Sequence, residues 1–217
     1  QVIKGTLRNH GMKATFMAKP FASLPGSGMH LHLSLYDNQG ENLLAPRNSK
    51  KLNQAVSGIL DLMPESMIFC APHANSYHRF EENSYAPINA TWGKDNRTTA
   101  LRIPSGNEDS TRIEHRLSGA DANPYLVMAM LISGFLHGFE EDPEIPPETI
   151  GNGYEDGSRP LPQSWEAALD LFQNKSRLSS ILGQEFSTLY TQLKSGEQKR
   201  FRRVITPHEY DWYLHTV

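Results

Sequence analysis

The chain has 217 residues and a formal net charge of −3. That length is enough to bury a full core, and the negative net charge argues against recruitment by nucleic acid or an anionic membrane. The single cysteine, Cys70, excludes an internal disulfide and favours a reducing compartment. Its apolar neighbours indicate a buried, unreactive thiol. We therefore expect a cytoplasmic protein with neither a membrane nor a nucleic-acid partner.

The first residues, 1–10, have the pattern of a helix end that is stopped by Gly11. A chain that begins in this way, with Gln1, indicates a fragment of a longer protein. Residues 14–19 are expected to form a short strand that leads into a turn at Pro20.

Residues 29–35 alternate strictly between apolar and polar side chains, which predicts a half-buried strand. His30, His32 and Ser34 share the polar face. Gly26, just before this strand, would let the backbone approach a ligand closely. A strand with a solvated polar face explains the pattern equally well.

A helix is predicted over residues 51–63, followed by an irregular polar stretch over residues 71–89. Ordered loops of that length are usually functional, although a solvated connector is the alternative. Two strands, 88–92 and 98–103, are expected next. Arg97 and Arg102 lie at the start and near the end of the second strand.

Charged side chains alternate along residues 112–117, which predicts a further strand. Arg112, Glu114 and Arg116 share one face, so the carboxylate would lie between two guanidinium groups and stay ionised. A ladder of ion pairs on a solvated face is the simpler interpretation.

A long helix is predicted from Asn123-Pro124 to about Gly138, and its apolar residues on nearly all sides indicate that it is buried. The segment 140–162 is rich in Pro, Glu and Gly and marks a boundary to a helical C-terminal part.

Amphipathic helices are expected over residues 164–173 and 184–193. A capping box at Thr206 begins a last helix. We expect that helix to pack through Tyr210, Tyr213 and Leu214.

The polar faces supply His30 and Glu114 as candidate ligands for a divalent cation. Candidate anion-binding residues are Arg79, Arg97, Arg102, Arg112 and Arg116. Imidazole and carboxylate suit Mg²⁺ or Mn²⁺ only when substrate phosphate and further carboxylates complete the shell. Guanidinium groups bind phosphate and carboxylate through two parallel hydrogen bonds, so these arginines indicate an oxyanion-rich substrate and suit phosphoryl transfer.

Seven short motifs, in order and spread over nearly the whole chain, resemble the C-terminal catalytic domain of the glutamine synthetase family. They lie at residues 19–20, 26–34, 75–79, 96–104, 112–116, 122–126 and 206–208. The resemblance implies an α+β fold in which a curved antiparallel sheet, a partial barrel, is packed by helices.

The resemblance also implies a division of the chain. Residues 1–140 would form the catalytic sheet-and-helix core, without the upstream part of the family's catalytic domain and without its N-terminal small domain. Residues 141–217 would form a linker and the C-terminal helical part of the same domain.

Roles for the site residues follow from the same resemblance. His30 and Glu114 would ligate the metal, Mg²⁺ or Mn²⁺, that sits on the nucleotide phosphates. ATP would be contacted by His32, Ser34, Arg97, Arg102 and Arg112, of which Arg97 and Arg102 would also act on the transferred phosphoryl group. Glutamate would be held by Gly26, Arg79 and Arg116.

The implied reaction has two steps: ATP phosphorylates the side-chain carboxylate of glutamate, and an amine then displaces phosphate. Active sites of the family form between neighbouring subunits of large homo-oligomeric rings, and further metal-binding glutamates lie upstream. This chain alone is therefore expected to lack ligase activity and to bind nucleotide weakly.

Two departures from the family pattern concern the amine. Tyr85 stands where the ammonia-using enzymes carry a glutamate that binds ammonium, and a phenol is uncharged at neutral pH. Pro25 replaces an asparagine that contacts glutamate. These changes resemble the branch that joins glutamate to organic amines, such as the gamma-glutamylputrescine synthetases, so we expect an alkyl amine or polyamine as the nucleophile.

Two alternatives remain open from the sequence. One is an ammonia-using glutamine synthetase, and the other is a noncatalytic relative retained as a structural subunit. The intact candidate ligands, His30 and Glu114, together with the arginines, argue against the second.

Overall fold

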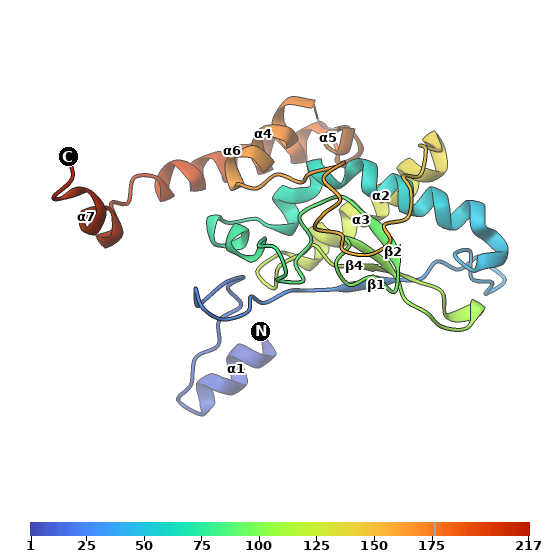
Figure 1. The fold of residues 1–217 in the computed structure, drawn as a ribbon, viewed down its shortest axis with the longest axis horizontal. Coiled ribbons are helices and arrows are strands. Elements are labelled where there is room, and N and C mark those ends of the chain that lie inside the picture. The colour runs from blue at the N-terminus through green and yellow to red at the C-terminus, as the bar shows by residue number, and fades with distance from the viewer. Residues whose placement is uncertain (176) are drawn as a thin grey trace.

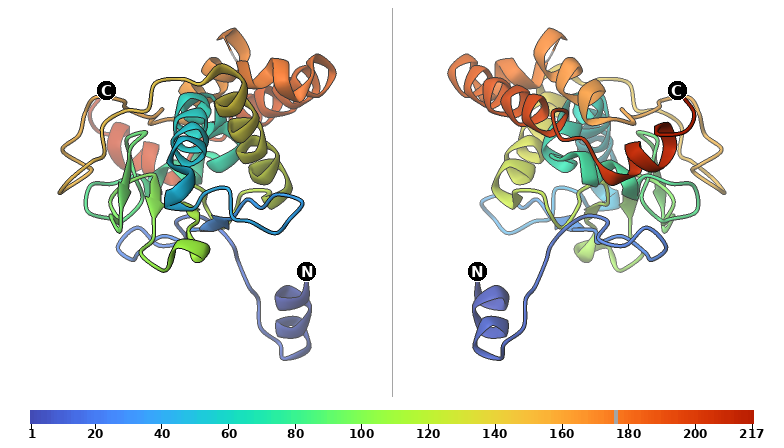
Figure 2. Two further views of the ribbon diagram at one scale, coloured as in Figure 1. Left: turned by 90° about the vertical axis from the view of Figure 1, so that its right-hand side faces the viewer. Right: turned by 90° about the vertical axis from the view of Figure 1, so that its left-hand side faces the viewer.

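The computed structural model describes residues 1–175 and 177–217. Its body is a small sheet with a group of helices that cover one face (Figures 1 and 2). Two short helices lie away from that body. Helix α1 (Val2–Asn9) ends an N-terminal arm, and α7 (Pro207–Tyr213) follows α6 (Gln184–Phe201) at the far end of the molecule.

The sheet has four strands in the order β1-β4-β3-β2 and is not closed. The strands are β1 (Leu31–Leu33), β2 (Trp92–Lys94), β3 (Leu101–Ile103) and β4 (Ile113–His115). The α+β class is confirmed. The sheet is mixed, because β2 pairs in parallel with β3 while the β1–β4 and β4–β3 pairs are antiparallel. Segment 95–100 returns the chain to the level of Trp92, the first residue of β2. Strand β3 therefore starts opposite Trp92 and runs in the same direction as β2.

The strand register separates a polar row from apolar rows. His32 lies opposite Glu114, and Glu114 lies opposite Arg102, so these three side chains share one face. On the other face Ile113 and His115 are fully buried. The alternation predicted for residues 112–117 is therefore confirmed.

Two expected strands do not form. Residues 14–19 have no strand partner, and the Lys19 backbone is held instead by the Asn75 side-chain amide, at 2.9 Å through each of two hydrogen bonds. Most of segment 88–92 pairs with the linker rather than with the sheet, since the Leu161 N–H donates to the Ile88 carbonyl at 3.0 Å.

Helix α2 (Ser49–Cys70) is longer than predicted. The predicted helix ended at residue 63, directly before Pro64, which lacks an N–H and disfavours a helix interior. The helix continues because its last turns, including Met67, Ile68 and Phe69, are almost completely buried, and such packing outweighs the loss of one hydrogen bond. Burial also raises the pKa of the Cys70 thiol to about 12, as expected for an inert cysteine.

Helix α3 (Pro124–Glu141) packs along α2. The Asn123 side chain caps it by accepting from the Tyr125 N–H at 3.0 Å. The expectation of burial on all sides was wrong, because one face is exposed to solvent. The exposed apolar residues on that face are Tyr125, Met128, Ile132 and Leu136.

The remaining helices lie on the opposite side of α2 from the sheet or extend from there. They are α4 (Trp165–Lys175), α5 (Arg177–Leu182) and α6. Short 3₁₀ helices, η1 (Pro46–Asn48), η2 (Ala74–Arg79) and η3 (Glu108–Ser110), lie elsewhere. The capping box at Thr206 is confirmed. The expected packing of α7 is not observed, since Tyr210, Tyr213 and Leu214 are each more than half exposed.

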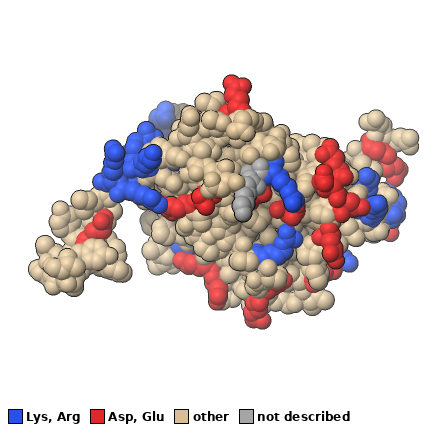
Figure 3. All heavy atoms as spheres, turned by 90° about the horizontal axis from the view of Figure 1, so that it is seen from above, with Lys and Arg blue, Asp and Glu red and all other residues tan. Residues whose placement is uncertain are grey.

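Acidic and basic side chains are mixed over the face shown in Figure 3, apart from a basic group near the end of α6, where Lys199 and Arg200 occupy the last turn. In the part of the chain that the structure describes, every helix is too short or too polar to cross a bilayer. The division of the chain near residue 140 stays a prediction.

Glycines allow α2 and α3 to approach closely, and this contact can be tested. A Cβ on Gly138 would overlap the Gln54 carbonyl of α2. We expect Gly138→Ala to lower the free energy of unfolding by about 2 kcal/mol or more, because the backbones would have to separate. Gly196 in α6 has open space around it, so Gly196→Ala should raise stability by about 0.5–1 kcal/mol. Urea unfolding of both variants measures the difference, and equal effects would contradict this packing.

Candidate active site

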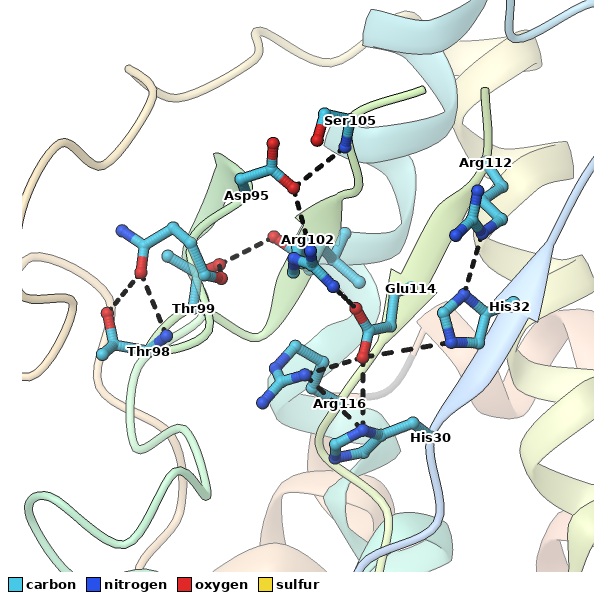
Figure 4. A network of polar contacts seen from close by, with 12 residues as sticks. His30, His32, Asp95, Thr98, Thr99, Arg102, Ser105, Arg112, Glu114 and Arg116 are labelled. Carbon is cyan, nitrogen blue, oxygen red and sulfur yellow. Dashed lines mark hydrogen bonds and ion pairs between the residues drawn. The ribbon is translucent and has the colours of Figure 1, made fainter. Parts of the chain in front are cut away.

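Glu114 lies at the centre of a polar network on the exposed side of the sheet (Figure 4). Its Oε1 accepts from Arg116 Nη1 at 2.6 Å, and its Oε2 accepts from Arg102 Nη1 at 2.9 Å. The side chain is 4% exposed. The sequence predicted a carboxylate between Arg112 and Arg116, but the second guanidinium comes from Arg102 on the neighbouring strand, which is closer across the ladder.

The arginines keep Glu114 ionised. Burial alone would raise its pKa, but the hydrogen bonds and positive charge of Arg102 and Arg116 outweigh burial and hold the pKa below its usual value. Breaking such a buried pair would leave an uncompensated charge, which is strongly destabilising.

The two candidate metal ligands converge. His30 Nδ1 lies 3.2 Å from Glu114 Oε1, and His32 Nε2 lies 4.0 Å from the same oxygen. Burial and the charge of Arg116 lower the pKa of His30, which favours the neutral imidazole that binds metals. Among the described residues no three His, Cys, Asp or Glu side chains gather as a metal site. The imidazole and carboxylate therefore fit part of a Mg²⁺ or Mn²⁺ shell, and the other ligands must come from elsewhere.

A cavity of about 230 Å³ lies beside this network. Its lining comprises Gly26, Gly28, His30, Arg79, Ser84, Tyr85 and Ala86. Arg79 is 5% exposed and donates from Nη1 to the Leu117 carbonyl at 3.2 Å. Pockets for drug-sized ligands measure roughly 300–1,000 Å³, so this smaller cavity suits a ligand the size of an amino acid.

Gly26 is needed for this arrangement. A Cβ there would lie 2.7 Å from Arg79 Cγ and 2.8 Å from the Ala18 carbonyl oxygen. In the structure, the close neighbour of the Gly26 backbone is Arg79, which lines the cavity. The predicted approach of Gly26 to a ligand stays a prediction. Gly28 likewise adjoins the guanidinium, since a Cβ there would lie 3.1 Å from Arg79 Nη2.

Tyr85 lies at the rim of the cavity and is 61% exposed. It has a φ of +59°, and Asn83 has a φ of +62°. Both values are unusual for residues other than glycine. The loop is held in part by the Ser84 hydroxyl, which donates to the carbonyls of Arg79 and Glu81 at 2.9 and 2.6 Å.

Not all of the predicted site residues join the network. Arg112 does, because its Nε donates to His32 Nδ1 at 3.1 Å. Arg97 lies in the turn before β3 and Ser34 follows β1, and both are exposed. Among the described residues, no hydrogen bond or ion pair joins either side chain to Glu114, and the carboxylate partners instead are Arg102, Arg116 and the two histidines.

Asp95 is a member of the network that the sequence did not reveal. Its Oδ1 accepts from Arg102 Nη2 at 2.8 Å and from the Ser105 N–H at 2.9 Å. With Glu114 on the other side, Arg102 is held between two carboxylates (Figure 4). The Asp95-Asn96 pair, which is typical of a turn, was the signal in the sequence, and Asp95 adopts a left-handed conformation there with a φ of +49°.

The fold and this site place two arginines and a histidine around one buried carboxylate, beside a small cavity. The family model described as "Glutamine synthetase, catalytic domain" matches residues 1–213. The chain belongs to the glutamine synthetase family, a family of carbon–nitrogen ligases, and the resemblance seen in the sequence is confirmed.

Three curated relatives are ligases named for organic amines. The chain is 43% identical to gamma-glutamylputrescine synthetase PuuA of Escherichia coli K12 over 99% of this chain and 46% of that protein. It is 38% identical to gamma-glutamylethanolamide synthetase GlnA4 of Streptomyces coelicolor, over 94% and 43% of the two chains. For glutamate–isopropylamine ligase of Pseudomonas sp. the identity is 35%, over 99% and 49%.

The solved structure titled "Apo GmaS without ligand" is similar in fold, with a TM-score of 0.87 and 30% identity over 98% of this chain and 51% of that chain. The chain thus spans about half the length of the relatives it matches.

The role of Asp95 predicts a pH-dependent effect on stability. Hydrogen bonds from Ser105 and the charge of Arg102 lower the pKa of Asp95 to about 2. Its contribution to stability is therefore complete above the ordinary aspartate pKa, near 4, and is lost as the pH falls towards 2. Thermal melting of wild type and Asp95→Asn should give a difference in Tm that is largest at pH 7 and shrinks below pH 4. A difference that is constant with pH would contradict this interpretation.

Proposed function

We propose that the protein is an ATP-dependent ligase that joins the side-chain carboxylate of glutamate to an organic amine or polyamine such as putrescine. The observation that carries this proposal is the position of Tyr85 at the rim of a small cavity that is also lined by Arg79 and His30. Binding groups for a carboxylate substrate thus lie beside the metal ligands, while a phenol occupies the position from which the amine would enter.

Glutamate would bind in the cavity through Arg79, Arg116 and the open backbone at Gly26. The two arginines differ in their present partners: Arg79 donates from Nη1 to the Leu117 carbonyl and lies over the Phe80 ring, whereas Arg116 is paired with Glu114. Arg79 is therefore the better candidate for a direct bidentate contact with a substrate carboxylate.

ATP would place its γ-phosphate near the polar row of the sheet. Arg102 is the central candidate for neutralising the transferred phosphoryl group, because Asp95 and Glu114 already fix its orientation. Arg112 and His32 lie on the same face, and Arg97 and Ser34 would contribute from the exposed ends of the strands. His30 and Glu114 would hold a divalent cation, which supplies positive charge against the phosphate oxygens.

The reaction balances in two transfers. A glutamate side-chain oxygen takes the γ-phosphoryl group and ADP leaves. The neutral amine then attacks the acyl carbon, phosphate leaves with the bridging oxygen, and the amine nitrogen gives up a proton. An amine must be deprotonated to attack, and Tyr85 carries no charge with which to attract ammonium. An uncharged aromatic rim instead suits the alkyl part of an organic amine.

The rest of the active centre would come from further chain. Among the described residues two candidate metal ligands converge and no third joins them. Helix α7 and one face of α3 also expose apolar side chains that such a protein would normally cover. We propose that the ligase works as a large homo-oligomeric ring with additional ligands upstream, and that these 217 residues alone are inactive.

An amine panel tests the proposal. Phosphate release by the full-length protein with ATP, glutamate and Mg²⁺ should be faster with putrescine, ethanolamine or isopropylamine than with ammonium at equal concentration. Equal or faster turnover with ammonium would instead support an ammonia-using glutamine synthetase, and no turnover with any amine would support a noncatalytic relative.

Tyr85→Glu provides the matched variant. A carboxylate at the rim would attract ammonium, so kcat/KM for ammonium should rise relative to that for the best organic amine, by on the order of tenfold for about 1.4 kcal/mol of added interaction. Tyr36→Phe, which alters an exposed tyrosine in the turn after β1, serves as the control and should leave the ratio unchanged.

A further inference from the structure

A buried tyrosine of the linker reaches the loop that borders the cavity. Tyr154 is 9% exposed, and its hydroxyl donates to the Ala86 carbonyl at 3.2 Å. Ala86 directly follows Tyr85, and both line the cavity beside Arg79. Burial raises the pKa of Tyr154, and its contacts with the Ser84 hydroxyl and the Tyr85 backbone oppose that rise. The phenol therefore lies beside the Ser84–Ala86 turn and is joined to it by the hydrogen bond to Ala86.

This turn needs support from outside. Asn83 and Tyr85 both have positive φ, a conformation that Asn tolerates but that is unfavourable for tyrosine. Such backbone persists only where surrounding contacts over-determine it. The Ser84 hydroxyl supplies contacts within the turn, and Tyr154 supplies a hydrogen bond from a segment far away in sequence.

Hydrogen bonds to the residues just before Tyr154 hold the linker in place. The Gly153 carbonyl accepts from Asn89 Nδ2 at 3.1 Å, and the Gly153 N–H donates to Thr98 Oγ1 at 2.8 Å. Asn96 Nδ2 adds a hydrogen bond to the Gly151 carbonyl at 2.8 Å. A tyrosine anchored in this way can hold the turn at one position rather than follow its motion.

We infer that Tyr154 is a positioning residue for the choice of amine, because its hydroxyl fixes the Ala86 carbonyl and thereby holds Tyr85 at the rim of the cavity. This inference rests on the proposed ligase function. It assigns to the linker, which lies outside the seven sequence motifs that carry the family resemblance, a part in setting the acceptor specificity.

The chain offers a closely matched control. Tyr190 in α6 is also buried, at 8% exposure, and its hydroxyl donates to the Ile68 carbonyl at 3.1 Å. Tyr154→Phe and Tyr190→Phe therefore remove the same chemical group and the same kind of hydrogen bond. Their effects on stability should be similar, but only Tyr154 contacts the turn.

Steady-state kinetics of the full-length protein would separate a positioning role from a structural one. In Tyr154→Phe the KM for the best organic amine should rise on the order of 3- to 10-fold, which is the size expected for the loss of one hydrogen bond, while the KM values for ATP and glutamate stay near those of wild type. Tyr190→Phe should leave all three KM values unchanged. An unchanged amine KM in Tyr154→Phe, or the same shift in both variants, would overturn the inference.

Hydrogen exchange gives a readout that does not depend on the reaction. Amides of residues 83–86 should exchange faster in Tyr154→Phe than in wild type or Tyr190→Phe. If the amine panel shows ammonia to be the substrate, the proposed specificity fails, whereas faster exchange in this turn would still support the positioning role. Exchange that is the same in all three proteins would contradict it.

Discussion

The site depends on the neutralisation of one buried carboxylate by two guanidinium groups. Glu114 is almost fully removed from water, and a lone ionised carboxylate in such a place would cost several kcal/mol. Arg102 and Arg116 offset that cost at 2.9 and 2.6 Å. The consequence is a rigid cluster, and in the proposed reaction the charges that would meet phosphate would already be in place, so little reorganisation would be needed.

The strand register makes this cluster possible. Three strands of only a few residues place His32, Glu114 and Arg102 side by side, while their neighbours on the opposite face join the core against α2. The glycines between α2 and α3 let those helices pack closely behind the sheet. Contacts from distant segments then complete the site, with Asp95 on one side of Arg102 and the linker, through Tyr154, against the turn that holds Tyr85.

Much of this could be predicted from local sequence patterns. The alternation around Glu114 identified the polar face, the Asn123-Pro124 pair identified the start of α3, and the spaced motifs identified the family. The errors arose where tertiary contacts decide. Pro64 lies within a helix because the following turns are buried, and the partner of Glu114 comes from β3 because register, not spacing along one strand, sets the nearest arginine.

Asp95 and Tyr154 escaped prediction for the same reason. Each acts through a hydrogen bond to a residue brought near only by the fold, and neither belongs to a periodic pattern. The exposed faces of α3 and α7 show a second limit of prediction from sequence. An apolar pattern indicates that a surface is covered, but it does not identify the segment or partner that covers it. In this family of ligases, further chain is the expected cover.

The central claim is that glutamate is activated by phosphorylation before an organic amine attacks it. Glutamate labelled with ¹⁸O in its side-chain carboxylate tests this most directly, with the full-length protein, ATP and putrescine present. The account predicts that one labelled oxygen appears in each released phosphate and that gamma-glutamylputrescine forms in equal amount, because the bridging oxygen leaves with phosphate. Unlabelled phosphate, or labelled phosphate formed without an amide product, would contradict it.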